Sequence, residues 1–196
     1  MLTALLPTIV FAAVIFSWIA FAIVFLTRKK PGPATERKRE SGSIIGIVLQ
    51  AMSYALVWSV HRPYFTTIFN GGETVAWLIG IGTILLAVSS VAVTMSAVRT
   101  LGKEWSLTAR VVEGHRLATK GPYAWVRHPI YTGMFGMLLA TALAMSSWFV
   151  IPLAAILFIA GTTIRIRHEE KLLRESFGSE FDAYAARVSA LIPGIY

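Results

Sequence analysis

Long apolar runs without a charged residue constrain the fold of this chain more than any other feature. Leu2–Leu26 has 25 residues without a charge, and Val75–Val98 has 24. A helix needs about 20 apolar residues to cross the hydrocarbon core of a bilayer. Three shorter runs follow the same pattern: Ser43–Val60, Ile130–Met145 and Trp148–Ile164. We therefore expect an all-α, polytopic membrane protein with about five transmembrane helices.

The composition agrees with a membrane protein. Charged residues make up 14% of the chain, against roughly 25% in soluble domains. The net charge of +8 would suit nucleic acid, but the charges lie in the gaps between apolar runs, so we expect no nucleic-acid partner. The absence of cysteine excludes disulfides, thiolate metal sites and a cysteine nucleophile. The first run has no basic residues before it and is too long for a signal sequence, so we expect a retained anchor.

The last two apolar runs are separated only by Ser146 and Ser147, which predicts a tight helical hairpin. The first of these runs carries Gly136, Ala140 and Ala144 at spacings of four. Small residues at this spacing let another helix backbone approach closely. We interpret this small-residue stripe as a packing surface without chemistry that suits the seam of the hairpin.

The distribution of basic residues predicts the orientation in the membrane. With five helices, 17 of the 18 Lys and Arg residues fall on one side, and Arg62 alone falls on the other. Basic residues favour the cytoplasmic side, so we expect the N-terminus outside and the C-terminus inside. The basic linker 27–42 should lie near the anionic headgroups of membrane lipids.

Polar residues concentrate in two segments on the predicted cytoplasmic side, Leu101–Pro129 and Arg165–Tyr196. Pro129 suits the first turn of a helix and disfavours helix at the residue before it. Arg127 and His128 should therefore lie at a helix N-terminus, where backbone N–H groups and the helix dipole favour an anion. The alternative is an interfacial arginine and histidine without chemistry.

In the second segment, Arg165 and Glu169 are four residues apart, as are Ile166 and Glu170. On a continuing helix each pair lies on one face. A carboxylate held near an arginine at the membrane surface can accept hydrogen bonds from hydroxyls or amines. The alternative is a solvated helix end with ordinary ion pairs.

Together the two segments form an ordered pattern: Gly121-Pro122-Tyr123, Arg127-His128-Pro129-Ile130-Tyr131-Thr132-Gly133, a hydrophobic hairpin, Glu169-Glu170, Phe177-Gly178, Tyr184 and Ile192-Pro193. This pattern resembles the isoprenylcysteine carboxyl methyltransferase family and its relatives, the phospholipid N-methyltransferases. The resemblance covers about residues 101–196 and divides the chain into an N-terminal part, 1–100, with helices one to three, and a catalytic region, 101–196.

The resemblance implies S-adenosylmethionine as the cofactor, with S-adenosylhomocysteine as its product, bound by cytoplasmic loops over the hairpin and without a Rossmann sheet. It implies Arg165 and Glu169 as catalytic residues. It also implies a set of cofactor-binding residues: His115, Gly121, Tyr123, Arg127, His128, Pro129, Tyr131, Gly133, Glu169 and Glu170.

The implied reaction needs no general base when the acceptor is a carboxylate, because the carboxylate is already an anion at pH 7. Such a site must align the reacting atoms and exclude water. Arg165 could hold one carboxylate oxygen while the other attacks. An amine acceptor would have to lose a proton, for which Glu169 is the candidate. The substrate could be a prenylated cysteine, another lipid-like acid or a phospholipid amine.

Two other functions compete with this hypothesis. Ile192-Pro193-Gly194-Ile195-Tyr196 resembles the C-terminus of sterol-type reductases, which use a nicotinamide cofactor. A binding or transport role would favour charged residues inside the spans, and the first four spans have none. We expect no metal site, because His61, His115, His128 and His168 do not form paired clusters.

Overall fold

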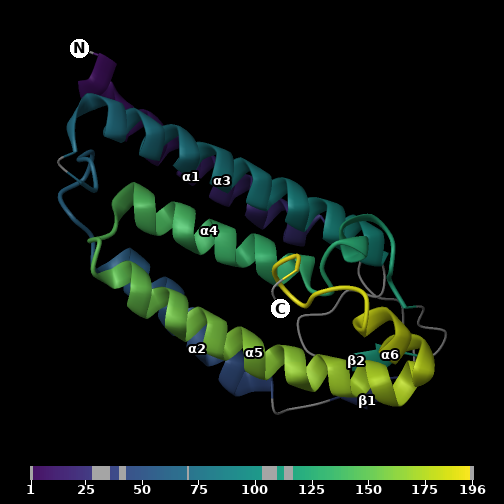
Figure 1. Cartoon of the computed structure of the whole chain (residues 1–196). Helices are drawn as coiled ribbons and strands as arrows, with labels where there is room; N and C mark the ends of the chain where they lie inside the picture. Colours follow the sequence, from purple (N-terminus) through teal and green to yellow (C-terminus); the bar gives the residue numbers. More distant parts are fainter. Residues whose placement is uncertain are drawn as a thin grey trace.

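The computed structural model describes residues 2–27, 36–39, 43–69, 71–102, 110–112 and 117–194. It confirms the five predicted apolar helices (Figure 1), which are α1 (Leu2–Leu26), α2 (Ser43–Ser59), α3 (Gly72–Leu101), α4 (Pro129–Met145) and α5 (Val150–Phe177). The helices α1, α3 and α5 are long and apolar enough to cross a membrane, whereas α2 and α4 are apolar helices of 17 residues. The polytopic membrane fold is therefore confirmed.

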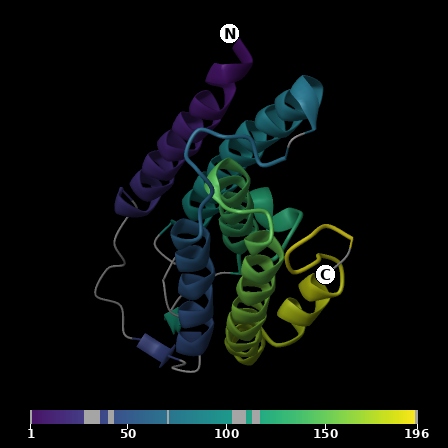
Figure 2. The ribbon, with the colours of Figure 1, turned by 90° about the vertical axis from the view of Figure 1, so that its left-hand side faces the viewer.

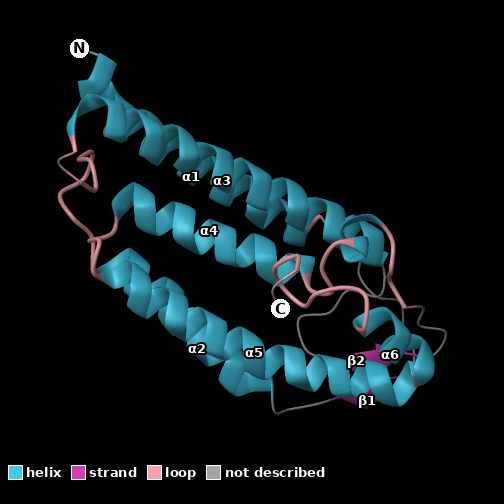
Figure 3. Cartoon of the chain, viewed as in Figure 1, coloured by secondary structure: helices cyan, strands magenta, loops and turns pink. Residues whose placement is uncertain are grey.

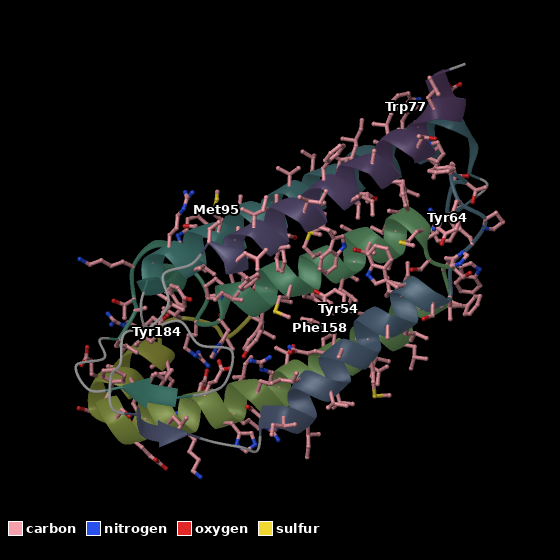
Figure 4. The ribbon with its side chains drawn as sticks, turned by 180° about the vertical axis from the view of Figure 1, so that it is seen from behind. Tyr54, Tyr64, Trp77, Met95, Phe158 and Tyr184 are labelled. Atoms are coloured by element: carbon pink, nitrogen blue, oxygen red, sulfur yellow. The ribbon has the colours of Figure 1, made fainter. Side chains whose placement is uncertain are left out.

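Helix α4 lies between two pairs of helices (Figure 1). One of its faces packs against α1 and α3, and the opposite face packs against α2 and α5. The first contact buries Leu6, Val10, Val14, Phe21, Ala87, Met137, Ala140 and Ala144. The second buries Val57, Leu138, Ala142, Val150, Ala154 and Phe158. Figure 4 shows Tyr54 of α2 beside Phe158 of α5 in this second layer, with ring centroids 6.1 Å apart.

The small-residue stripe of α4 packs, as predicted, but against α3 and α1 rather than along the α4–α5 seam. A Cβ atom added at Gly136 would collide with Ser90 of α3. Ala140 and Ala144 belong to the cluster shared with α1 and α3. The hairpin partner α5 instead meets the face of α4 that carries Leu138. The predicted seam is therefore wrong, because α4 has two buried faces and its small face belongs to the other one.

The helices α2 and α5 cross in direct backbone contact at Gly46 and Gly161. A Cβ atom on Gly46 would lie 2.5 Å from the carbonyl oxygen of Gly161, and one on Gly161 would lie 2.7 Å from the carbonyl oxygen of Gly46. Only glycine permits so close an approach at both positions. The crossing brings the polar side chains of α2 within reach of those on α5.

The described residues between α1 and α2 and between α3 and α4 lie at one end of the molecule, together with the segment after α5 (Figures 1 and 3). The strands β1 (Glu36–Arg39) and β2 (Arg110–Val112) pair there in an antiparallel ladder. The short helices η2 (Gly121–Ala124) and α6 (Ser179–Ala185) lie at the same end, and Figure 2 shows the C-terminal segment beside α5. These two strands are the only ones among the described residues, so this part of the chain holds no parallel nucleotide-binding sheet.

At the opposite end, Arg62 binds the last turn of α4. Its guanidinium donates to the carbonyl oxygens of Leu143 (2.9 Å), Ala144 (2.7 Å) and Ser146 (2.7 Å). A cation at a helix C-terminus satisfies free carbonyl groups and opposes the helix dipole. The one basic residue that departs from the charge pattern thus has a structural role. Figure 4 shows Tyr64 at this end and Tyr184 at the other.

Candidate active site

Local sequence determines how the chain enters α4. Gly121 has a φ of +61°, a conformation that favours glycine, and starts the turn of η2. Pro129 is the first residue of α4, and His128 before it has the non-helical angles φ −125° and ψ 60°. The structure thus confirms that α4 begins at Pro129, as predicted from the preference of proline for the first turn of a helix. Arg127 and His128 therefore lie immediately before the helix.

The segment after α6 pairs through its backbone with the residues that precede α4. The N–H of Arg127 donates to the carbonyl oxygen of Ser189 (2.8 Å), and the N–H of His128 donates to that of Ala190 (2.9 Å). The two segments are about 60 residues apart in sequence. The start of α4 and the C-terminal segment are thus one structural unit.

Glu170 of α5 joins this unit through two cationic side chains. Its Oε1 accepts hydrogen bonds from Nε of Arg127 (2.8 Å) and from Nε2 of His128 (3.1 Å). The Nη1 of Arg127 also donates to the carbonyl oxygens of Ala185 (3.1 Å) and Val188. The anion beside Arg127 is therefore a carboxylate of the chain itself. Arg127 and Glu170 are each 14% exposed, so the pair is only partly screened by solvent.

Glu169 forms a second group of contacts, one residue earlier on α5. Its Oε1 accepts a hydrogen bond from the hydroxyl of Tyr131 and lies 3.8 Å from Nη2 of Arg165, and its Oε2 lies 3.5 Å from Nδ1 of His128. The guanidinium carbon of Arg165 lies 5.0 Å from the centre of the Tyr131 ring, a cation–π arrangement. The predicted pairing of Arg165 with Glu169 on one helix face is confirmed.

The same part of the chain matches a family of known proteins. Residues 82–175 match the model of the isoprenylcysteine carboxyl methyltransferase (ICMT) family, just under half of the chain. The match contains Arg127, His128, Arg165, Glu169 and Glu170. This segment of the chain is similar to the ICMT family.

The chain is also similar to several curated proteins. The uncharacterized protein YpbQ of Bacillus subtilis is 26% identical over 164 residues, which cover 81% of this chain and 96% of that protein. A protein-S-isoprenylcysteine O-methyltransferase of Tribolium castaneum is 31% identical over 66% of this chain and 47% of its own length. The nickel-cobalt-cadmium resistance protein NccN of Alcaligenes xylosoxydans xylosoxydans is 37% identical over 56% and 50%. The chain thus spans about half the length of the last two relatives. The family match and the methyltransferase relatives support a membrane methyltransferase.

Five side chains form one cluster, which carries more positive than negative charge when His128 is protonated: Arg127, His128, Arg165, Glu169 and Glu170. Burial alone would lower the pKa of His128, but its contacts with Glu169 and Glu170 outweigh burial and raise the pKa above its ordinary value. Three cations (Arg127, His128 and Arg165) then face two carboxylates, which leaves a net charge of one positive unit. Such a cluster favours an anionic ligand beside Arg165.

The other residues that the ICMT resemblance implies lie at different distances from this cluster. Tyr123 is buried, and its carbonyl oxygen accepts a hydrogen bond from the hydroxyl of Tyr184 (2.6 Å), which ties η2 to α6. Gly133 faces α3, where an added Cβ atom would collide with Thr94. Gly133 thus contacts α3 rather than the two glutamates. His115 lies outside the described residues.

One contact of the cluster was not anticipated from the ICMT motifs. The Nη1 of Arg165 donates to Oε1 of Gln50 on α2 (3.0 Å), and Nε2 of Gln50 donates to Oγ1 of Thr162 (2.7 Å). The sequence did contain a signal, because Gln50 is the only strongly polar side chain in its apolar run. Polar side chains inside a span are costly unless they are paired.

The raised pKa of His128 predicts a pH-dependent contribution to stability. An unfolded histidine has a pKa of about 6.5. The contribution of His128 should be complete below about pH 6.5 and should be lost as the pH rises through the higher folded value. The thermal midpoint in detergent, measured from pH 6 to pH 9, should fall more steeply for the wild type than for His128→Gln.

His61→Gln is the matched control, because His61 is exposed at the opposite end of the molecule. It should keep the wild-type slope. Equal slopes for the wild type and His128→Gln would contradict the pairing of His128 with the two glutamates.

Proposed function

We propose that this chain is an S-adenosylmethionine-dependent methyltransferase that methylates the carboxylate of a lipid-like substrate, most like a prenylated cysteine. The observation that carries the proposal is the pairing of Arg165 with Glu169 in the C-terminal half of α5, beside Glu170 and His128. Arg165 directly follows the charge-free part of α5, where the polar head of an amphiphile from the bilayer would arrive.

The donor set suits the proposed cofactor. Among the residues that the structure describes, Glu170 makes its contacts through Oε1, which leaves Oε2 to accept hydrogen bonds from ribose hydroxyls or an amino group. Glu169 is 23% exposed and can accept in the same way. The bound cofactor would supply a methyl group on a positively charged sulfur. Arg127 and His128 hold Glu170 in place for this role.

Arg165 suits an acidic methyl acceptor. Its guanidinium is held by Glu169 and Gln50 and stacks on Tyr131, and its side chain is only 5% exposed. A planar guanidinium binds a carboxylate through parallel hydrogen bonds. In this position Arg165 would orient one carboxylate oxygen and leave the other to attack, while the buried surroundings exclude water.

A phospholipid amine is the weaker candidate for the acceptor. A protonated amine would approach a cluster in which Arg165 and Arg127 balance the two glutamates and a protonated His128 adds one positive charge. Repulsion between like charges disfavours that approach, whereas an anionic acceptor is attracted. The charge balance of the site therefore favours the carboxylate.

Cofactor binding tests the proposal directly. The wild-type protein should bind S-adenosylhomocysteine in an isothermal titration and should not bind NADPH. The substitutions Glu169→Gln and Glu170→Gln should each weaken binding by roughly 1–3 kcal/mol, the cost of losing a charged hydrogen bond. Glu180→Gln, at an exposed position of α6, should leave the affinity unchanged.

Binding of NADPH in place of S-adenosylhomocysteine would support the reductase alternative. Wild-type affinity in both glutamate variants, with the proteins folded, would mean that the cofactor site lies elsewhere in the chain.

We also propose that the N-terminus lies outside and that the cluster lies at the cytoplasmic face, because of the distribution of basic residues. The chain has no cysteine, so single cysteines can be introduced cleanly. In intact cells an impermeant thiol reagent should label Thr67→Cys and should not label Lys120→Cys. The opposite labelling pattern would reverse the orientation.

A further inference from the structure

Gln50 connects α2 to the candidate active site through a buried chain of hydrogen bonds. It accepts from Arg165 and donates to Thr162, at 3.0 and 2.7 Å. All three residues are buried: Gln50 is 3% exposed, Thr162 0% and Arg165 4%. The chain therefore lies inside the α2–α5 contact, and Gln50 lies outside residues 82–175, which match the ICMT family.

The chemistry of the three groups determines the orientation of the Gln50 amide. A guanidinium has only donors, so the atom of Gln50 that faces Arg165 must be the oxygen. The amide nitrogen then points to Oγ1 of Thr162, which can accept. Arg165 thus fixes the orientation of the amide, and the amide oxygen holds one arm of the guanidinium while Thr162 accepts from the amide nitrogen.

The backbone crossing of α2 and α5 makes this contact possible. Gly46 precedes Gln50 by one helical turn and Gly161 precedes Thr162, and the two glycines bring the helix backbones together. A Cβ atom on Gly161 would lie 3.1 Å from the backbone nitrogen of Gln50 itself. If the two helix backbones lay farther apart, the hydrogen bond between Gln50 and Arg165 would be lost.

We propose that Gln50 is a positioning residue that holds the Arg165 guanidinium for an anionic methyl acceptor, and that its neutral amide keeps the charge of Arg165 available to that acceptor. The inference rests on the proposed function, because it names the acceptor class of the same site. It goes beyond that function by assigning a role to α2 and by predicting what a charged side chain would do there.

The inference depends on residue 50 being an amide rather than a carboxylate. Either side chain could accept the hydrogen bond from Arg165. A carboxylate would also form a buried ion pair with the guanidinium, which attracts strongly where solvent screening is weak. Glu169 already lies 3.8 Å from Nη2 of Arg165, so the substrate carboxylate would then compete with two internal anions. A neutral acceptor orients Arg165 without adding the second one.

Two substitutions separate orientation from charge. Gln50→Glu keeps an acceptor of the same size and adds a negative charge, whereas Gln50→Met keeps the volume and removes the acceptor. Ser53→Ala is the matched control, because Ser53 is also buried on α2 and donates to the carbonyl oxygen of Ala154 on α5 (2.9 Å). The control removes an α2–α5 hydrogen bond without touching Arg165.

The probes are a prenylated N-acetylcysteine with a free carboxylate and the same molecule as its neutral carboxamide. Affinity for both is measured by titration in detergent, with S-adenosylhomocysteine affinity and thermal midpoint measured on the same samples. The wild type should bind the carboxylate more tightly than the amide. Gln50→Glu should reduce this preference by roughly 10- to 100-fold, and Gln50→Met should reduce it less. Ser53→Ala should keep it, and all variants should keep wild-type affinity for S-adenosylhomocysteine.

Methyl transfer to the carboxylate probe distinguishes failure of this inference from failure of the proposed function. If the wild type transfers methyl groups but both Gln50 variants keep its carboxylate preference and turnover within twofold, the role of Gln50 is contradicted and the function stands. If the wild type transfers no methyl group but prefers the carboxylate, and Gln50→Glu removes that preference, the function is contradicted and the role of Gln50 in an anion site stands. Equal wild-type affinity for carboxylate and amide overturns the inference.

If Gln50→Glu does not fold, Gln50→Met decides the question. A weaker carboxylate preference with unchanged S-adenosylhomocysteine affinity supports the positioning role. An equal loss of both affinities, with the thermal midpoint lowered further than in Ser53→Ala, means that Gln50 only supports the fold.

Discussion

The adjacent carboxylates of Glu169 and Glu170 on α5 hold the candidate active site together. Glu170 binds the side chains of Arg127 and His128, which immediately precede α4, and the backbone of the same two residues pairs with the C-terminal segment. Glu169 draws Arg165 and Tyr131 into the same cluster. Three segments that are distant in sequence thus meet at a pair of charges. Because the surroundings are largely buried, removal of either partner would leave an uncompensated charge, which is strongly destabilising.

The close backbone contact of α2 and α5 at Gly46 and Gly161 is the second constraint. It brings the neutral amide of Gln50 on α2 against Arg165, which also contacts Glu169 of α5 and Tyr131 of α4. The ICMT-family match begins at residue 82, so this contribution comes from outside the matched segment. Helix α2 therefore contributes a side chain to the candidate site.

The sequence was sufficient for the five apolar helices and insufficient for their pairing. Charge-free runs define the five helices, and Pro129 places the start of α4, because both depend on short stretches of chain. Which helices pack together depends on contacts between distant residues, and an apolar span offers little periodicity to reveal them. The small-residue stripe of α4 was therefore assigned to the wrong neighbour. The pairing of Gln50 with Arg165 was missed for the same reason, although its polarity within a span was visible, and His115 lies outside the described residues.

The central claim is that Arg165 orients an acidic methyl acceptor while the glutamates bind the cofactor. Arg165→Lys tests it most directly, because lysine keeps the charge and loses the planar pair of donors. Methyl transfer to a lipid-like carboxylate should fall by roughly one to two orders of magnitude, at about 1.4 kcal/mol per decade, while affinity for S-adenosylhomocysteine stays within twofold of the wild type. An equal loss of turnover and cofactor affinity would place Arg165 in the cofactor site and contradict this division of roles, and unchanged turnover would leave Arg165 without a part in the reaction.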